Sequence, residues 1–417
     1  MTSNVSLADA PRSVFAGRAF RLYCGGTFLG TLANQILSVA VAWQMYALTH
    51  SALALGNVGL VQFLPMTLCV FVAGDLADRR DRKVILTASY FVYAIGAGLL
   101  LILTLMEADA IWPFYTVLAL FGAARAFGQP AGQSFLPALV ADEQFPEAVA
   151  WTSSARQAAV IVGPALGGAI YLLGASVAYV VCLVAFLTVT LAIAAVHSNS
   201  GFVPSTHEGS TFQRLTAGII YTRQQPIILG AISLDLFAVL LGGATALLPI
   251  YARDILRVGP TGLGLLRSAP AVGAAVVGAI LGRAPLQRRV GLVLFACVAI
   301  FGAATIVFGL SRSFALSLAA LIVLGASDMV SVYVRSTFVQ LATPDSMRGR
   351  VSAINSLFIG ASNELGEFES GITAAWFGTV PSVVIGGIGT LVVVGLFTWL
   401  FPQLRMVNQM SELGPRP

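Results

Sequence analysis

Long apolar runs separated by short polar segments dominate the sequence. Twelve of these runs are each about as long as the ~20 residues that a helix needs to cross the hydrocarbon core of a bilayer. The pattern predicts transmembrane helices near residues 20–47, 53–73, 84–106, 112–134, 145–172, 175–196, 227–252, 262–282, 290–310, 314–338, 350–376 and 381–402. We therefore expect an all-α membrane protein in which short connections join twelve transmembrane helices.

The longest polar interruption divides these helices into two sets of six. The predicted organisation is an N-terminal tail (1–19), a first six-helix bundle (20–196), a linker (197–225), a second six-helix bundle (226–402) and a C-terminal tail (403–417). A shift of 203 residues places Gly122 on Gly325 and Phe135 on Phe338, a weak repeat that favours two pseudo-symmetric bundles. In such a fold the substrate binds between the bundles, near the middle of the membrane.

Composition supports a membrane protein and excludes several other classes. The chain is 57% hydrophobic and only 10% charged, unlike a soluble domain. The net charge of +5 does not indicate nucleic-acid binding, because most of the basic residues lie in the loops between apolar runs. The four cysteines and three histidines show no metal-ligand spacing, and no phosphate-binding Walker loop is present. We therefore expect no enzyme activity, no cofactor and no bound metal.

The distribution of basic residues predicts the orientation in the membrane. Most of the 23 Lys and Arg residues fall in segments that share one side with the N-terminus, whereas the opposite loops hold only Arg253, Arg257 and Arg312. Because short loops rich in Lys and Arg remain in the cytoplasm, both termini are predicted to be cytoplasmic.

A cluster of charges joins the second and third predicted helices. The ten residues from Gly74 to Lys83 contain three acids and four bases in the order Gly-Asp-Leu-Ala-Asp-Arg-Arg-Asp-Arg-Lys. This segment resembles the loop signature Gly-x-Leu-Ala-Asp-Arg-x-x-Arg-Lys of the major facilitator superfamily. An Asp replaces the usual Gly at position 81, as in the branch that contains the enterobactin exporter. The resemblance implies a cytoplasmic gate formed by Gly74, Asp75, Asp78, Arg79 and Arg82. The alternative is that the bases only orient the chain.

A second motif lies in the fifth predicted helix. Gly163, Pro164, Gly167 and Gly168 resemble the Gly-Pro-x-x-Gly-Gly motif of exporters in the same superfamily. Glycines allow close approach of helices in a bilayer, and proline permits a kink. Ordinary packing of small residues is the alternative interpretation.

Three carboxylates lie within the eleventh predicted helix. Glu364 and Glu367 share one face of the helix, whereas Glu369 points elsewhere. Acids inside a membrane segment are costly and are candidates for function. We interpret Glu364 and Glu367 as candidate proton-coupling groups. Pairing with a membrane arginine, or binding of a cationic substrate or metal, remain open alternatives.

Other polar side chains in the predicted helices complete the candidate set. The proton-coupling candidates also include Asp235, Asp328 and Arg125, the last because it resembles the superfamily's buried arginine. Candidates for lining the substrate cavity are Asn34, Gln35 and Glu369. A structural salt bridge is an equally good interpretation for any one of these charges.

Together these features predict a secondary-active exporter in the bacterial cytoplasmic membrane. It would act as a monomer by alternating access, exchange its substrate for protons, and be driven by the proton gradient without a cofactor. The resemblance implies a siderophore-like or drug-like amphipathic substrate. Two alternatives remain, namely an importer or cation-coupled symporter on the same fold, and a sensor or scaffold in the membrane that transports nothing.

Overall fold

The first half of the chain forms six long helices, as predicted. The structure is a computed structural model that describes residues 13–196 and 211–410. Its first bundle consists of α1 (Arg18–Thr49), α2 (Ala52–Arg79), α3 (Arg82–Leu105), α4 (Trp112–Phe135), α5 (Phe145–Tyr171) and α6 (Ala175–Ala194). Short 3-10 turns precede α1 and join α4 to α5, at Val14–Ala16, Leu136–Leu139 and Asp142–Gln144.

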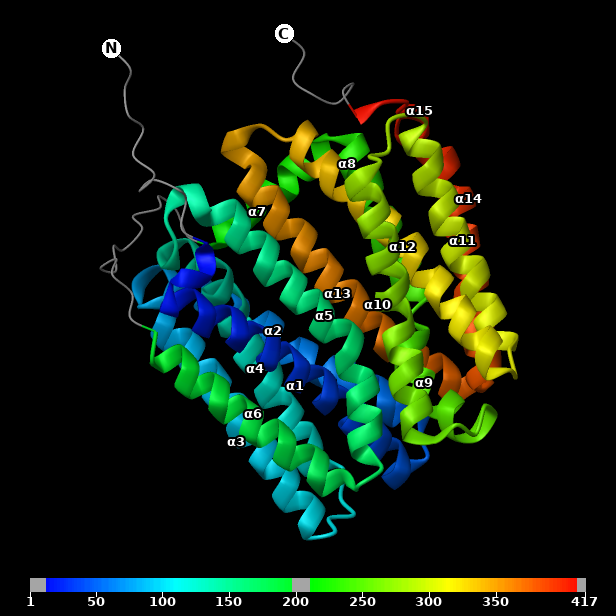
Figure 1. Ribbon diagram of the computed structural model, residues 1–417. Helices are drawn as coiled ribbons and strands as arrows, with labels where there is room; N and C mark the ends of the chain where they lie inside the picture. The colour runs from blue at the N-terminus through cyan, green and yellow to red at the C-terminus, as the bar shows by residue number, and fades with distance from the viewer. Residues whose placement is uncertain (1–12, 197–210, 411–417) are drawn as a thin grey trace, which may run out of the picture.

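The second half repeats this arrangement with one interrupted helix. The first crossing comprises α8 (Pro226–Leu241), a 3-10 turn (Ala244–Leu247), α9 (Leu248–Ile250) and a π-helical turn, η6 (Tyr251–Ile255). It is followed by α10 (Gly259–Arg283), α11 (Val290–Leu310), α12 (Phe314–Ala342), α13 (Asp345–Phe377), α14 (Thr379–Leu400) and the short α15 (Pro402–Met406). The two bundles lie side by side, with α5 and α13 in the centre (Figure 1).

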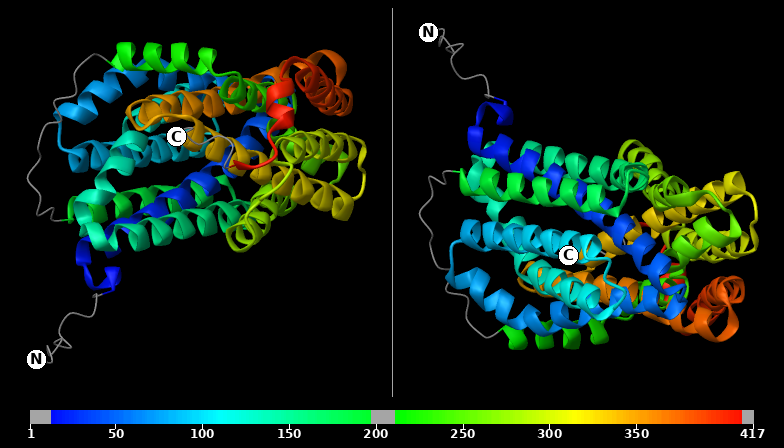
Figure 2. Two further views of the ribbon diagram at one scale, coloured as in Figure 1. Left: turned by 90° about the horizontal axis from the view of Figure 1, so that it is seen from above. Right: turned by 90° about the horizontal axis from the view of Figure 1, so that it is seen from below.

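Part of the predicted linker is helical. Residues 211–224 of the predicted linker form α7 (Thr211–Gln224), and residues 197–210 lie outside the described part of the chain. Helix α7 lies on the outside of the assembly against α13 and α2 (Figure 2). Only Thr343 and Pro344 separate α12 from α13.

Three of the twelve crossing helices are too polar to be recognised by hydropathy alone. Within the described residues, nine helices are long and apolar enough to span a membrane, and α4, α5 and α13 are not among them. These three carry the charged residues Arg125, Arg156, Glu364 and Glu367 in their interior. Such residues are tolerated in a bilayer when they face the centre of the bundle.

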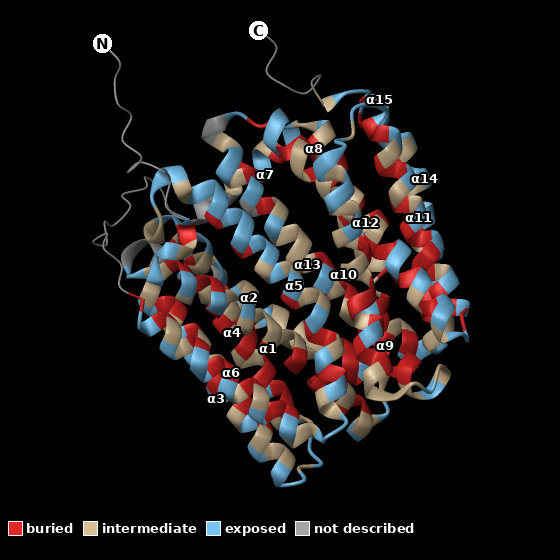
Figure 3. Ribbon diagram, in the orientation of Figure 1, coloured by how far each residue is buried: buried red, intermediate tan, exposed pale blue. Residues whose placement is uncertain are grey.

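The outward faces of the helices are apolar and exposed. Leu191 of α6 and Trp399 of α14 are 70% and 77% exposed, and exposed residues run along the outer helices in Figure 3. An apolar surface of this extent is expected to contact lipid.

Equivalent glycines hold equivalent helices together in the two bundles. A Cβ atom added to Gly122 of α4 would lie 2.1 Å from the carbonyl oxygen of Gln62 in α2. At Gly325 of α12, the residue 203 positions later, it would lie 2.0 Å from the carbonyl oxygen of Pro270 in α10. Both crossings require glycine for the same steric reason, which supports the internal repeat predicted from the sequence.

Candidate functional site

A cavity of about 540 Å³ extends from one end of the assembly to its middle. We call the end where α1 begins and where α15 lies the termini end. The lining residues near that end are Tyr23, Leu86, Gln133 and Ile193, and those near the middle are Arg125, Arg267, Glu364 and Glu367. Among the lining residues that the structure describes, only Arg267, Glu364 and Glu367 come from the second bundle.

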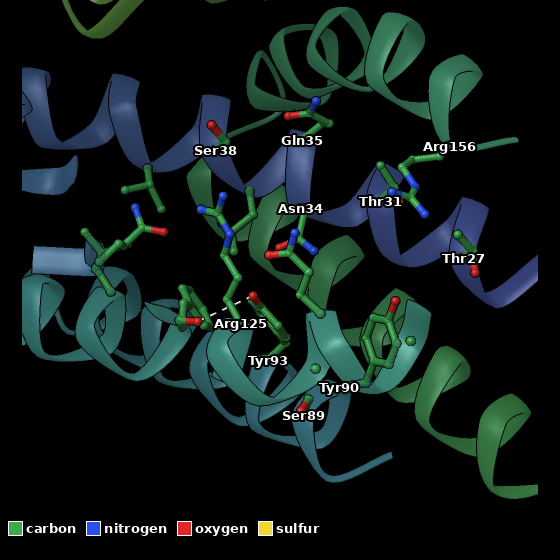
Figure 4. A pocket seen from close by; sticks show the side chains of 18 of the residues that line it. Thr27, Thr31, Asn34, Gln35, Ser38, Ser89, Tyr90, Tyr93, Arg125 and Arg156 are labelled. Carbon is green, nitrogen blue, oxygen red and sulfur yellow. Dashed lines mark hydrogen bonds between the residues drawn. The ribbon is translucent and has the colours of Figure 1, made fainter. Parts of the chain in front are cut away.

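Neutral polar side chains from the first bundle form much of the cavity wall. The predicted residues Asn34 and Gln35 line it, as do Thr27, Thr31 and Ser38 from the same face of α1 (Figure 4). Helix α4 contributes Arg125, Gln129 and Gln133 at intervals of one helical turn. We did not assign these threonines and glutamines from the sequence, although their helical spacing on the same face as Asn34 or Arg125 was a usable signal.

Four charges from both bundles meet at the inner end of the cavity. Arg125 Nη1 donates a hydrogen bond of 2.7 Å to Glu364 Oε1. The Arg125 side chain is 41% exposed, toward the cavity, whereas that of Glu364 is 12% exposed. Glu367 lies within electrostatic reach of Glu364, Arg125 and Arg267. Because the two guanidinium groups balance the two carboxylates, this cluster is neutral overall when both acids are ionised.

Arg267 makes a second polar connection between the bundles. Its Nη1 atom donates a hydrogen bond of 2.8 Å from α10 to the main-chain carbonyl of Ser38 in α1. Together with the Arg125–Glu364 pair, it ties each bundle to the other beside the cavity. The charged cluster is therefore sensitive to any relative movement of the bundles.

Close backbone contacts seal the end opposite the termini end. A Cβ atom on Gly168 of α5 would lie 2.3 Å from the carbonyl oxygen of Pro260 in α10. A Cβ atom on Gly371 of α13 would lie 2.6 Å from the Cα atom of Gly56 in α2. The hydroxyl group of Tyr46 also donates a hydrogen bond to the carboxylate of Asp254, from α1 to η6. The cavity is thus closed at this end.

The glycines of the predicted exporter motif all lie at packing contacts. Gly163 faces the side chain of Gln35, and Gly167 faces the backbone of Ile36, both in α1. Gly168 faces α10 in the other bundle, and the carbonyl oxygen of Pro164 lies 2.3 Å from a Cβ atom placed on Gly264. The motif therefore joins α5 to its own bundle and to the second bundle at once.

Only part of the predicted gate can be described. The backbone from Gly74 to Arg79 is the last part of α2, but the surroundings of Gly74 and the side chains of Asp75, Asp78 and Arg79 lie outside what the structure describes. Arg82, at the start of α3, donates a hydrogen bond of 2.8 Å from Nη1 to the carbonyl oxygen of Ser134 near the end of α4. This contact lies within the first bundle.

Three predicted residues lie away from the cavity. Asp235 of α8 forms an ion pair with Arg335 of α12 inside the second bundle. Asp328 does not line the cavity, and neither does Glu369, whose carboxylate accepts a hydrogen bond of 2.8 Å from Thr373. Glu369 is displaced because it lies on a different face of α13 from Glu364 and Glu367. The expectation that it lines the cavity is therefore not met.

The chain is similar in sequence to a known protein family. A family model described as "Transmembrane secretion effector" matches residues 10–414. The enterobactin exporter EntS of Citrobacter koseri is 25% identical over 391 residues, which cover 94% of each chain.

Solved structures show the same fold at low sequence identity. A bacterial homolog of the human lysosomal transporter Spinster, solved in an inward-facing and occupied conformation, has a TM-score of 0.72 at 13% identity. The match covers 92% of this chain and 96% of that chain. A bacterial homologue of the iron transporter ferroportin has a TM-score of 0.70 at 17% identity, covering 93% and 99%. The chain is therefore a multi-pass membrane transporter, not an enzyme, and belongs to the transmembrane secretion effector family of the major facilitator superfamily.

Proposed function

We propose that the protein is an exporter that exchanges a small amphipathic organic molecule for protons by alternating access. The observation that carries this proposal is the four-charge cluster at the inner end of a cavity that is sealed on the opposite side. The similarity to an enterobactin exporter supports the direction of transport. We further propose that the protein works as a monomer in a bacterial cytoplasmic membrane, with the proton gradient as its energy source.

The excess of basic residues at the termini end supports a cytoplasmic location for that end. Arg283 is the last residue of α10 there, and Arg288 and Arg289 follow it, whereas the loops at the opposite end contain few basic residues. Because basic loops remain in the cytoplasm, the cavity extends toward the cytoplasm in this conformation. An exporter takes up its substrate in that state.

Competition for the carboxylates of α13 would couple the two fluxes. When ionised, Glu364 accepts a hydrogen bond from Arg125 and Glu367 attracts Arg267, and both carboxylates would attract donor groups of the substrate. When protonated, each loses its negative charge and with it most of its attraction for those donors. Protons entering from the outside would therefore displace the substrate, and substrate entering from the cytoplasm would displace protons. Such competition between protons and substrate for the same carboxylates is what an exchange of the two requires.

The first experiment identifies a substrate and then tests coupling. Small molecules inside and outside cells that lack or overproduce the protein are profiled. A compound that accumulates inside without the protein is then followed in inverted membrane vesicles with an imposed pH gradient. We expect Glu364→Gln and Glu367→Gln each to abolish uptake that depends on the gradient, since neither amide can release a proton.

Glu369→Gln is the matched control. It changes the same chemical group on the same helix, outside the cavity, and we expect it to retain gradient-driven transport. Undiminished gradient-driven transport by both of the other variants would overturn proton coupling at this cluster. Loss of a compound from the medium on overproduction would instead indicate import.

A further inference from the structure

A single arginine stands apart from the four-charge cluster at the termini end of the cavity. Arg156 of α5 lines the cavity and is exposed. Figure 4 shows it at the same end as Thr27, Thr31 and Tyr90, while Ser38 and Arg125 lie toward the other end. Thr27 and Ser38 lie on one helix, and their separation corresponds to about 16 Å of helical rise. The cavity therefore has two chemically different ends.

Arg156 is the one lining cation whose charge the described residues leave unbalanced. Arg125 is paired with Glu364, and Arg267 lies beside Glu367 and donates a hydrogen bond to Ser38. The described lining residues include no third carboxylate, and within the described chain no ion pair involves Arg156. A cavity between low-dielectric walls focuses the field of such a charge and raises the local concentration of anions.

Aromatic side chains surround the space next to this arginine. Arg156 lies within electrostatic reach of the hydroxyl groups of Tyr23 and Tyr90. The Tyr23 hydroxyl donates a hydrogen bond of 2.7 Å to the carbonyl oxygen of Gly132, which fixes its position. Farther in, Tyr93 stacks on Phe121 with 5.2 Å between the ring centroids. Both rings line the cavity, which gives a flat molecule aromatic surfaces to pack against.

We propose that Arg156 is an anion-binding residue that selects aromatic acids as substrates. Its guanidinium group holds a carboxylate at the termini end, the aromatic residues contact the ring system, and donor groups at the far end reach Glu364 and Glu367. This inference deepens the proposed function and rests on it. It explains why one cation is kept without a partner in a cavity where the other charges are balanced, and it defines the substrate class as elongated, aromatic and acidic at one end.

The test is equilibrium binding of two dyes that share a xanthene ring system but differ in charge. Fluorescein is anionic and rhodamine 6G is cationic, and binding to the purified protein in lipid nanodiscs is followed by fluorescence anisotropy at neutral pH. We expect wild-type protein to prefer fluorescein. Arg156→Gln should weaken fluorescein binding about tenfold or more, the effect of losing one hydrogen bond to a charged group. Arg156→Lys should retain part of the affinity, and Arg156→Glu should reverse the preference toward rhodamine 6G.

Arg283→Gln is the matched control. Arg283 is exposed at the end of α10, outside the cavity, and donates a hydrogen bond to Ala279 in its own helix, so fluorescein binding should not change. Equal affinity of wild type and Arg156→Gln for fluorescein, or no preference of wild type for the anionic dye, overturns the inference. Because no gradient is applied, this result is independent of proton coupling. Charge-selective binding with failed vesicle transport would refute only the proposed exchange mechanism.

Discussion

At equivalent positions of the two bundles, α5 has Pro164 and α13 has Glu367, 203 residues later. The main chains at these positions make matching contacts. The carbonyl oxygen of Pro164 lies 2.3 Å from a Cβ atom placed on Gly264 of α10, and that of Glu367 lies 3.1 Å from one placed on Gly56 of α2. The side chains differ completely, since one interrupts helical hydrogen bonds and the other brings a carboxylate to the cavity. The repeat has therefore kept the backbone contact and changed the chemistry.

The two bundles also use the charges within their helices differently. In the first bundle, Arg125 and Arg156 line the cavity. This bundle also contributes most of the neutral polar residues that line the cavity. The second bundle supplies the two carboxylates and pairs Asp235 with Arg335 in its own interior. The same fold thus provides a binding wall in one half and candidate titratable groups in the other. Three further predictions test how charges and contacts within and between the two bundles contribute to stability and closure.

The largest effect is expected from breaking the ion pair inside the second bundle. The side chains of Asp235 and Arg335 are only 8% and 2% exposed. Asp235→Asn would leave Arg335 buried without a counter-charge, which costs about 3–5 kcal/mol. We expect a large fall in the thermal unfolding temperature of the purified protein. The double variant Asp235→Leu with Arg335→Leu should recover most of the loss, because it removes both charges. An unchanged unfolding temperature for Asp235→Asn would mean that this pair does not stabilise the bundle.

A smaller energetic effect is expected from alanine substitutions at the glycine crossings that seal the cavity. Gly168→Ala and Gly371→Ala should each force apart two helices of different bundles, because the new methyl group meets backbone atoms. Overpacking of this kind costs about 3 kcal/mol at its upper end. Spin labels at Asp109→Cys and Arg312→Cys, in a background without the native cysteines, report the distance between the bundles at this end. Both variants should increase the population with the longer distance.

A control variant at Gly395 and the relative size of the two distance shifts test whether the effect comes from the crossings between the bundles. Gly395 of α14 has nothing within 4 Å of an added Cβ atom, so Gly395→Ala should leave the distance distribution unchanged. Because the two crossings occupy equivalent places in the repeat, we expect shifts of similar size. A shift for only one of them would show that the bundles contribute unequally to the seal.

The sequence was sufficient to predict the crossing helices, and for nine of them within the described residues apolar length alone is enough, for a simple physical reason. A helix that spans lipid must be apolar over a fixed length, and that length can be counted. Features that depend on packing could not be predicted in this way. Gly218 of α7 packs against the backbone of Arg350 in α13, and Tyr221 donates a hydrogen bond of 3.1 Å to the carbonyl oxygen of Ala342 at the end of α12, although the surrounding segment is polar. The break after Leu241 places Gly243 against the backbone of Gly366, a contact that no local pattern indicates.

The candidate site could be predicted only in part for the same reason. Residues such as Asn34 and Gln35 were identifiable because polar groups inside an apolar run are conspicuous. The pairing of Arg125 with Glu364 joins residues 239 positions apart, and a single sequence does not show which of several membrane arginines meets which acid. The position of Arg156 at the termini end of the cavity likewise depends on how α5 packs beside α1.

The smallest of the three effects concerns the hydrogen bond between Tyr46 and Asp254. Tyr46→Phe removes a hydroxyl group that joins α1 to η6, and leaves the aromatic ring in its place, with the Arg253 guanidinium 5.9 Å from the ring centroid. Loss of one such bond costs about 1.5 kcal/mol, or roughly a tenfold change in the balance between closed and open states at this end. The same spin-label pair should therefore show a smaller shift than either glycine variant. Tyr115→Phe is the matched control, because its hydroxyl donates a 3.0 Å bond to Ala54 within the first bundle. That variant should lower stability without changing the distance between bundles. If both tyrosine variants change the distance equally, the Tyr46–Asp254 bond has no special role in holding the two bundles together.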